Sequence, residues 1–281
     1  MTTSVDALIE MLSVVEAGPD VFVGNGVETT RPRVFGGQVL GQALAAAGQT
    51  VEQDRPPHSL HSYFLRAGRA SEPIRYTVTN LRDGRTFSTR AVSACQGDRV
   101  IFQMTASFSA SGDGITHQQP ASITSSPAAA RPVADELDDM PDLYREWGSL
   151  DLRRVVPDSI HSTEIARASS AHAQVWMRTV NPIPADPLLH SSILACISDL
   201  SFLSVALLPH GISMRHEHHQ VASINHAVWF HRPAKVDEWL LFDQTSPAAV
   251  NGLALVQGHI YNSLGSLVVS AAQQGLIRPA R

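Results

Sequence analysis

The same order of a helix and several strands occurs twice along this chain of 281 residues. Each copy begins with a helix of small or apolar residues and continues with a strand that ends in an aromatic residue and an arginine. Phe64 and Arg66 lie 166 residues before Phe230 and Arg232, which end the corresponding strand of the second copy. A repeat of this period predicts two similar halves that stack against each other, with a functional site where they meet.

Hydrophobic periodicity predicts the elements of each half. Residues 36–48 (GGQVLGQALAAAG) and about 188–207 are the two long helices, and residues 6–16 are a short covering helix. Strands are expected at residues 58–68, 74–81, 86–95 and 100–108, and again at residues 174–180, 222–232, 238–245, 253–261 and 267–277. A long helix followed by antiparallel strands that can wrap it is typical of an α+β fold.

Composition divides the chain into three parts. Residues 1–110 form the first module, residues 170–281 the second, and residues 111–169 a linker. The linker is rich in Ser, Pro and Ala, and its acidic run (ADELDDMPD) is typical of a solvated face. Short surface helices are expected within it, for instance around residues 143–147.

Charge and cysteine content restrict the partners and the compartment. A formal net charge of -5 and a pI near 6.2 argue against a general nucleic-acid binder. Cys95 and Cys196 fall one in each half within apolar patterns, which favours buried thiols in a reducing compartment. The first residues lack the features of a signal peptide, and no apolar stretch is expected to reach the length of a membrane span. We therefore expect a soluble cytoplasmic protein.

Asp199 is a carboxylate in the middle of an apolar run of the second helix. Aspartate is a poor residue for a helix interior, and a buried carboxylate is costly unless it is paired or hydrogen-bonded. We interpret Asp199 as a desolvated base or as a carboxylate that orients water. The alternative is that Ser198, Asp199 and Ser201 form an exposed polar stripe together with Ser192.

Two further polar residues are candidates for the same site. Gln273 shares one face of the last strand with apolar residues, so its amide would need a partner there. In the opposite register Gln274 takes this place and Gln273 is in water. Ser223 begins the strand of the second Phe–x–Arg motif, and it is either an ordinary strand serine or a residue that holds water. A Ser–His–Asp hydrolase would need an elbow such as G-x-S-x-G, which is absent from the sequence.

Histidines and a pair of glycines complete the set of candidates. His58 and His61 lie at the start of the first-half strand, where a histidine satisfied by a neighbour is the more common outcome. Residues 215–219 (RHEHH) resemble a metal-binding tract but lack a ligand set at helical or C-x-x-C spacing, so no metal is expected. Gly36 and Gly37 open the first helix, whose free N–H groups and positive dipole end suit a polarised carbonyl oxygen or a phosphate.

Eight stretches of the chain resemble the bacterial acyl-CoA thioesterase II family. They cover nearly the whole chain except the linker: RVFGGQVLGQAL (33–44), HSYFLRAG (61–68), LRDGRTFSTR (81–90), MTASF (104–108), SDLSFLSVALLPHGI (198–212), HAVWFHRP (226–233), EWLLF (238–242) and AAQQGLIR (271–278). The resemblance implies a double hotdog fold, in which each repeat is a long central helix wrapped by an antiparallel sheet. It also implies hydrolysis of an acyl-CoA thioester to a free fatty acid and CoA, without a cofactor.

The resemblance further implies that Asp199, Ser223 and Gln273 bind the attacking water together. Asp199 would accept the proton of the water, while Ser223 and Gln273 would orient it toward the thioester carbon. A backbone N–H at a helix start, such as that of Gly37 in the opposite half, would stabilise the developing oxyanion. Charge and location alone suggest Arg66, Arg69 or Arg232 as contacts for the CoA phosphates.

The chain departs from the family pattern at three places. Ser223 stands where bacterial relatives often have Thr, which keeps the hydroxyl but loses a methyl group that restricts the rotamer. Asn225 stands where Asp often precedes the His of the same strand. The His-rich residues 216–219 also differ from the pattern. Neither of the first two changes removes a member of the polar trio.

Two other functions remain open at this point. A hotdog enoyl-CoA hydratase typically needs a His five residues after the helix Asp, whereas this chain has Ser204 there. A catalytically silent acyl-CoA-binding module would carry the same trio for structural reasons. In either case exposed sheet edges favour pairing between copies, so we expect a homodimer or homotetramer.

Overall fold

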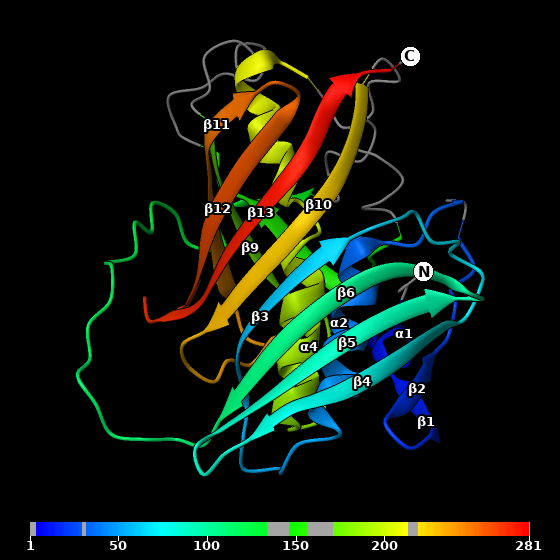
Figure 1. Ribbon diagram of the computed structural model, residues 1–281. Helices are drawn as coiled ribbons and strands as arrows, with labels where there is room; N and C mark the ends of the chain where they lie inside the picture. Colours follow the sequence, from blue (N-terminus) through cyan, green and yellow to red (C-terminus); the bar gives the residue numbers. More distant parts are fainter. Residues whose placement is uncertain (1–3, 30–31, 134–145, 157–170, 213–218, 281) are drawn as a thin grey trace.

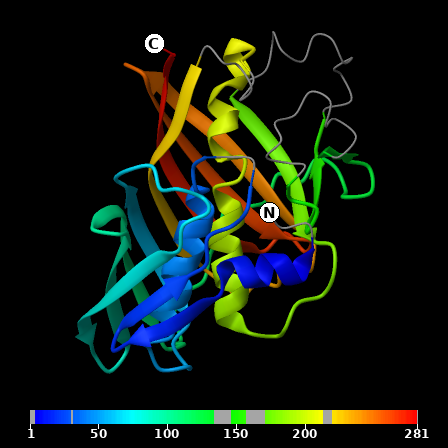
Figure 2. The same ribbon diagram turned by 90° about the vertical axis from the view of Figure 1, so that its right-hand side faces the viewer.

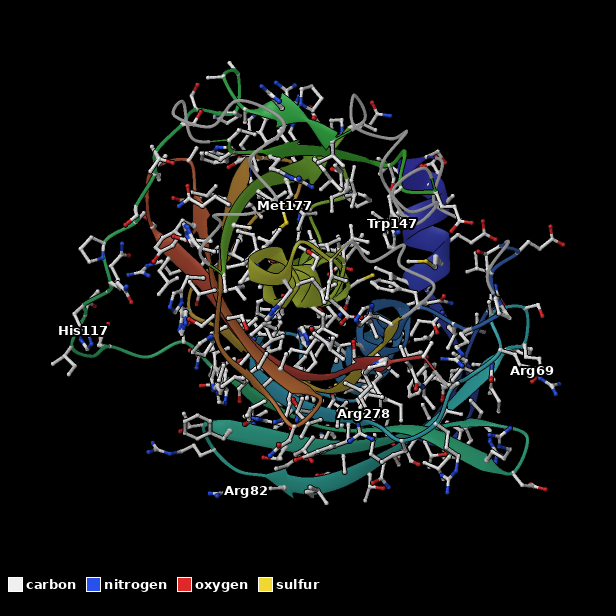
Figure 3. All side chains as sticks on the ribbon, turned by 90° about the horizontal axis from the view of Figure 1, so that it is seen from above. Arg69, Arg82, His117, Trp147, Met177 and Arg278 are labelled. Atoms are coloured by element: carbon white, nitrogen blue, oxygen red, sulfur yellow. The ribbon has the colours of Figure 1, made fainter. Side chains whose placement is uncertain are left out.

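A single antiparallel sheet curves around two adjacent helices (Figures 1 and 2). The computed structural model describes residues 4–29, 32–133, 146–156, 171–212 and 219–280. Within these ranges the strand order is β1-β2-β4-β5-β6-β3-β10-β13-β12-β11-β9-β8-β7. The core is continuous between both helices and the concave face of the sheet, which Figure 3 shows from above with Met177 pointing inward and Arg69 and Arg82 at the periphery.

The first half contains the amphipathic helix α1, two short strands, the central helix α2 and four longer strands. The alternating burial of β4, β5 and β6 places one face of each strand against α2, as the period of two predicts. Their bounds are α1 Val5–Leu12, β1 Val14–Gly18, β2 Val21–Gly24, α2 Gly36–Gly48, β3 Pro57–Phe64, β4 Ile74–Asp83, β5 Phe87–Gln96 and β6 Arg99–Ser109.

The second half repeats this order around the helix α4. Asp186 caps the start of α4, because its side chain accepts hydrogen bonds from the backbone N–H groups of Leu188 and Leu189. The bounds are β7 Arg131–Pro132, β8 Leu150–Arg154, β9 His172–Thr179, α4 Pro187–Ser198, the 3-10 helices η2 Phe202–Ala206 and η3 Leu208–His210, β10 His219–Phe230, β11 Leu240–Val250, β12 Leu253–Asn262 and β13 Leu267–Pro279.

The strands β3 and β10 join the two halves into one sheet (Figure 1). His61 pairs with Ala227, which lies 166 residues later and is therefore its own counterpart in the repeat. Neighbouring pairs, such as Leu60 with Val228, are symmetric about this point. The halves are therefore related by a local two-fold axis through the middle of the sheet, and this symmetry corresponds to the repeat in the sequence.

The helices α2 and α4 approach each other closely through glycines. A Cβ atom at Gly37 would lie 2.2 Å from the carbonyl oxygen of Cys196, and one at Gly41 would lie 2.9 Å from the carbonyl oxygen of Ser192. These distances leave no room for a side chain, so the two backbones pack directly. Helix α1 lies across both helices and covers them (Figure 2).

The second helix is shorter than the pattern predicts. α4 ends at Ser198 instead of continuing to about residue 207, and Asp199 is its C-cap. Beyond it the chain forms η2 and η3, in which Ser204 donates its hydroxyl to the carbonyl oxygen of Ser201. Serine and aspartate side chains compete with the helix for backbone groups, whereas the apolar pattern of the segment reflects only its burial.

Part of the predicted linker belongs to the second half. Residues 150–154 form β8 and pair with β9, and Trp147 is buried with its ring edge-on to Phe35 at 5.4 Å between centroids. Trp147 is in neither a helix nor a strand, and its carbonyl oxygen accepts a hydrogen bond from the N–H of Leu150. Residues 143–145 fall outside the described ranges. Sheet pairing therefore joins residues 150–154 to β9, while packing against Phe35 places Trp147 in the core.

Residues Pro187–His210 are long and apolar enough, by length and composition, to cross a membrane. The expectation that no stretch reaches this length was therefore wrong. Of the most apolar 18-residue window of this segment, 78% is buried inside the protein, as is usual for the central helix of a globular core. Burial against the sheet accounts for its apolar composition.

Candidate active site

Asp199, Ser223 and Gln273 lie in direct contact with one another. The Oδ1 atom of Asp199 accepts hydrogen bonds from the hydroxyl of Ser223 at 3.2 Å and from Nε2 of Gln273 at 2.5 Å. Nε2 of Gln273 also donates to the hydroxyl oxygen of Ser223 at 2.8 Å. The structure therefore brings together three residues that are up to 74 positions apart in the sequence.

The three residues come from three elements with different local reasons for their orientation. Asp199 is held at the end of α4, and Gln273 lies on the concave face of β13 with no exposed surface, whereas Gln274 is only half-buried. Ser223 faces inward because β10 has a bulge between Ser223 and Asn225. Without this extra residue, regular alternation would place the side chain of Ser223 on the opposite face of β10 from that of His226, away from the core.

Burial raises the pKa of the Asp199 carboxyl from 3.8 to about 6, although hydrogen bonds from Gln273, Ser223 and the backbone N–H of Gly37 oppose this rise. Desolvation penalises the charged form, while the donors stabilise it. The carboxylate can therefore exchange a proton near neutral pH. Oε1 of Gln273 has no hydrogen-bond partner among the described residues, so a buried acceptor remains beside this carboxylate.

The first turn of α2 contributes the glycine backbone around the carboxylate. A Cβ atom at Gly36 would lie 2.8 Å from Oδ2 of Asp199 and 2.9 Å from the ring of Phe64. The N–H of Gly37 donates to the Asp199 carboxylate in the free protein. Gly37 therefore lies next to the trio, and its predicted role toward an oxyanion stays a prediction.

His58 does not lie with the trio. Its Nε2 is 2.8 Å from the hydroxyl of Ser107, and its ring packs edge-on against Phe87. It is six residues from Phe64, which touches the Gly36 end of the site, and six residues of strand span roughly 20 Å. Because most of the length of β3 separates His58 from the trio, the structure does not support a direct role of His58 in the same reaction.

The candidate phosphate contacts take different positions. Arg66 and Arg232 are counterparts in the repeat, and each donates from Nη1 to a backbone carbonyl of the neighbouring strand, Val100 at 2.8 Å and Leu267 at 2.6 Å. Arg69 is exposed and pairs with Glu72 at 2.6 Å. Each arginine thus has a structural partner, and a phosphate contact stays a prediction.

The predicted His-rich tract gives no metal site that the structure describes. Residues 213–218, which include most of the tract, lie outside the described ranges. Among the described residues no group of three or more His, Cys, Asp or Glu side chains is arranged to hold a metal ion.

The corresponding place in the first half lacks the polar trio. Pro57 is the counterpart of Ser223, since both lie at a bulge and are 166 residues apart. Ala106 is the counterpart of Gln273, because it pairs with Leu60 as Gln273 pairs with His226. The C-cap of α2 is Gln49, whereas that of α4 is Asp199. Among the described residues this polar trio therefore occurs once per chain, although the fold occurs in two copies.

Sequence reasoning missed His226 and Ser198, which flank the trio. His226 has no exposed surface and its Nε2 is 2.8 Å from the hydroxyl of Ser198. His226 shares the buried alternation of Val228 in its strand, and this signal could have indicated that it points inward.

Two helices inside one shared sheet, with one polar trio in the part of the chain that the structure describes, define a double hotdog protein. An acyl-CoA thioesterase family model matches residues 154–276, and a model of the acyl-CoA thioesterase N-terminal domain matches residues 26–109. The chain belongs to the acyl-CoA thioesterase family.

Individual relatives are similar to this protein over nearly the whole chain. Human acyl-coenzyme A thioesterase 8 is 34% identical over 92% of this chain and 85% of its own length. Acyl-CoA thioesterase 2 of Haemophilus influenzae is 32% identical over 99% of both chains. The crystal structure of an acyl-CoA thioesterase II from Mycobacterium marinum superposes with a TM-score of 0.83 at 39% identity, covering 96% of this chain and 98% of that one. The expected fold class and family are thereby confirmed.

Proposed function

We propose that this protein hydrolyses fatty acyl-CoA to a free fatty acid and CoA by attack of an activated water on the thioester carbon. Relatives named acyl-CoA thioesterases, similar over almost the full length, support the reaction. The observation that carries the mechanism is the buried contact of Asp199 with Ser223 and Gln273. Hydrolysis of a thioester requires a base and a means to orient water, and the trio supplies both kinds of group.

Asp199 acts as the general base in this proposal. Its carboxylate takes a proton from water as the water oxygen bonds to the thioester carbon, and the carbonyl becomes an oxyanion. Ser223 and the free Oε1 of Gln273 orient the water. Collapse of the oxyanion breaks the carbon–sulfur bond, and the proton held by Asp199 is available to the departing thiolate.

The oxyanion would lie near the first turn of α2. Free N–H groups and the positive end of the helix dipole stabilise negative charge there, and such donors are worth about 3–4 kcal/mol in comparable sites. The N–H of Gly37 donates to Asp199 in the free protein, so it would have to be shared with or transferred to the substrate. The CoA phosphates would meet Arg66, Arg69 or Arg232.

A thiol-release assay on a panel of acyl-CoAs tests this function. The wild-type chain is expected to release CoA from at least one fatty acyl-CoA, and its preference reports the chain length. Tight binding without release from any member of the panel would instead support a silent binding module. Hydration of a crotonyl-type substrate would support a hydratase, although residue 204 is a serine that bonds its own turn.

The rate is expected to depend on pH through Asp199. Only the ionised carboxylate accepts a proton, and its pKa is raised to about 6. We expect kcat/KM to be constant above about pH 7 and to fall about tenfold for each pH unit below 6. A profile measured from pH 5 to 8.5 checks this, and a constant kcat/KM down to pH 5 would contradict the role of Asp199 as base.

Gln273 and Ser223 are expected to contribute unequally. Gln273→Ala removes the donor to both partners and the free acceptor, so we expect kcat to fall by on the order of 10²-fold. Ser223→Ala leaves Gln273 in contact with Asp199 and is expected to cost about tenfold. Ser223→Thr keeps the hydroxyl and serves as the matched control. Equal rates for wild type and Gln273→Ala would exclude the amide from the reaction.

We also propose that the protein is a homodimer or homotetramer and that it acts in the cytoplasm. The strand β1 pairs only with β2 among the described strands and its Val15 is 69% exposed, which supports pairing with another copy. Light scattering at micromolar concentration should give a multiple of 30.3 kDa, and a monomer mass would refute the assembly. The free thiols of Cys95 and Cys196 support a reducing compartment.

A further inference from the structure

His226 is a buried polar residue that the proposed reaction does not use. It lies on β10 with no exposed surface, and its ring packs edge-on against Phe202 at 5.8 Å between centroids. Burial lowers its pKa to about 3, so the imidazole is neutral at physiological pH. Burial of a neutral imidazole is costly unless its polar atoms are hydrogen-bonded, and the hydrogen bond of Nε2 leads toward the active site.

That hydrogen bond ends on the last residue of α4. The hydroxyl of Ser198 donates its one proton to the carbonyl oxygen of Ala195 at 2.8 Å, so in its other hydrogen bond its oxygen can only accept from a donor. Nε2 of His226, at 2.8 Å, is this donor, and the proton is therefore on Nε2. Ser198 directly precedes Asp199, so the imidazole anchors the helix end from which the carboxylate projects.

His226 also lies beside Gln273. The two residues are a directly opposed pair of β10 and β13, and both side chains are fully buried on the same face. Opposed side chains on antiparallel strands have Cβ atoms about 4.5–5.5 Å apart. Nδ1 of His226 and Oε1 of Gln273 are both acceptors without a partner among the described residues, so they do not bond to each other. The imidazole thus fills the space next to Gln273, whose Nε2 remains directed to Asp199 and Ser223.

We propose that His226 is a positioning residue of the active site, which holds Asp199 in place through Ser198 and supports the side chain of Gln273. This role rests on the proposed thioesterase function. Nothing in it requires His226 to touch the substrate or to gain or lose a proton. The hydrogen bond from Nε2 to Ser198 is the part that the structure makes testable.

The test compares variants that keep or remove this hydrogen bond. His226→Leu and Ser198→Ala both remove it, and we expect kcat/KM to fall by about 10–100-fold, since small displacements of reacting groups are costly. His226→Gln can place an amide N–H near the position of Nε2 and should restore most of the loss. Because the two single changes break one contact, the double variant should lose little more than His226→Leu.

The pH profile separates positioning from a purely structural role. Hydrogen bonds from Gln273, Ser223 and Gly37 hold the pKa of Asp199 down, so a displaced carboxylate should titrate at higher pH. Two other titratable groups lie near Asp199 among the described residues, and neither changes charge near neutral pH: burial raises the pKa of the Cys196 thiol and lowers that of His226 to about 3. We therefore expect the acid limb of kcat/KM to move upward in His226→Leu and Ser198→Ala.

Val228→Ala is the matched control, because Val228 is equally buried on the same face of β10 but makes no polar contact with the trio. It should lower the melting temperature without moving the acid limb. The proposal is overturned if His226→Leu and Ser198→Ala behave like this control, or if His226→Gln is as impaired as His226→Leu. An inactive wild type would overturn the thioesterase function and this role together. If the wild type is active and Asp199→Asn is not, the thioesterase function stands, and a negative result with the His226 variants overturns only the role of His226.

Discussion

Asp199→Asn is expected to lower kcat by about 10³-fold on every acyl-CoA that the wild type hydrolyses, which is within the usual contribution of a general base. The amide has almost the same shape and can still accept from Gln273 and Ser223, but it cannot take a proton from water. KM should change little, because the change leaves the hydrophobic walls of the site intact. Steady-state kinetics with thiol detection provides the measurement.

The same substitution is expected to make the folded protein more stable near neutral pH. The folded chain binds the proton of Asp199 more tightly than the unfolded chain, so wild-type stability falls as pH rises from about 4 to 6 and stays lower above that. A rise of the pKa from 3.8 to about 6 corresponds to roughly 3 kcal/mol of folding stability that the wild type loses when Asp199 ionises. The amide of Asn carries no charge, so the variant avoids this loss. Urea denaturation at pH 4 and pH 7.5 should show this gain only at the higher pH.

Reduced activity together with increased stability would separate chemistry from misfolding. An Asp199→Asn variant that retains wild-type kcat would exclude Asp199 as the base. A variant that is destabilised at pH 7.5 would show instead that the carboxylate is a structural anchor, with its hydrogen bonds outweighing the cost of burying its charge.

Gly37→Ala is expected to destabilise the fold by about 3 kcal/mol or more, at the upper end of the range for overpacking. In an exposed helix the same change is favourable by about 1 kcal/mol. Here the added Cβ would lie 2.2 Å from the carbonyl oxygen of Cys196 and 2.5 Å from the ring of Phe35, so α2 and α4 would have to separate. Urea denaturation of the folded chain measures the effect.

The separation of the helices should also affect activity, because Gly37 donates to Asp199 across the same contact. Gly112→Ala is the control, since a Cβ atom there has no neighbour within 4 Å and should change the stability by less than about 1 kcal/mol. A stable, fully active Gly37→Ala variant would show that the contact between α2 and α4 tolerates more space than the structure indicates.

Local patterns were sufficient to predict most elements. The helix at residues 36–48 has the predicted bounds, and the nine predicted strands begin and end within five residues of β3–β6 and β9–β13. Strands β1, β2, β7 and β8 were not predicted, and β1 begins at Val14, within the residues 6–16 that were expected to be helical. The predicted elements follow from periods of 3.6 and 2 in the residues that face one core. The same reasoning failed at residues 199–207, since a buried apolar segment has the same composition whether it is α-helical or 3-10 helical.

The site itself needed a different kind of information. Alternation left Gln273 and Gln274 equally possible, and it could not reveal the bulge that turns Ser223 inward. It also left His58 as a candidate, although His58 lies at the opposite end of β3 from Phe64, which is next to the site. His226 was missed because its partner, Ser198, is 28 residues away on another element.

The amino-acid order alone therefore determined that there are two similar halves, where their elements lie, and which polar residues interrupt apolar patterns. Such properties depend on neighbours within a few turns of helix or residues of strand. Only the tertiary structure decided that β3 pairs with β10, that α2 meets α4 through glycine, and that one acid, one hydroxyl and one amide share hydrogen bonds. Those contacts join residues far apart in the chain, and their geometry is set by the packing of whole elements in one core.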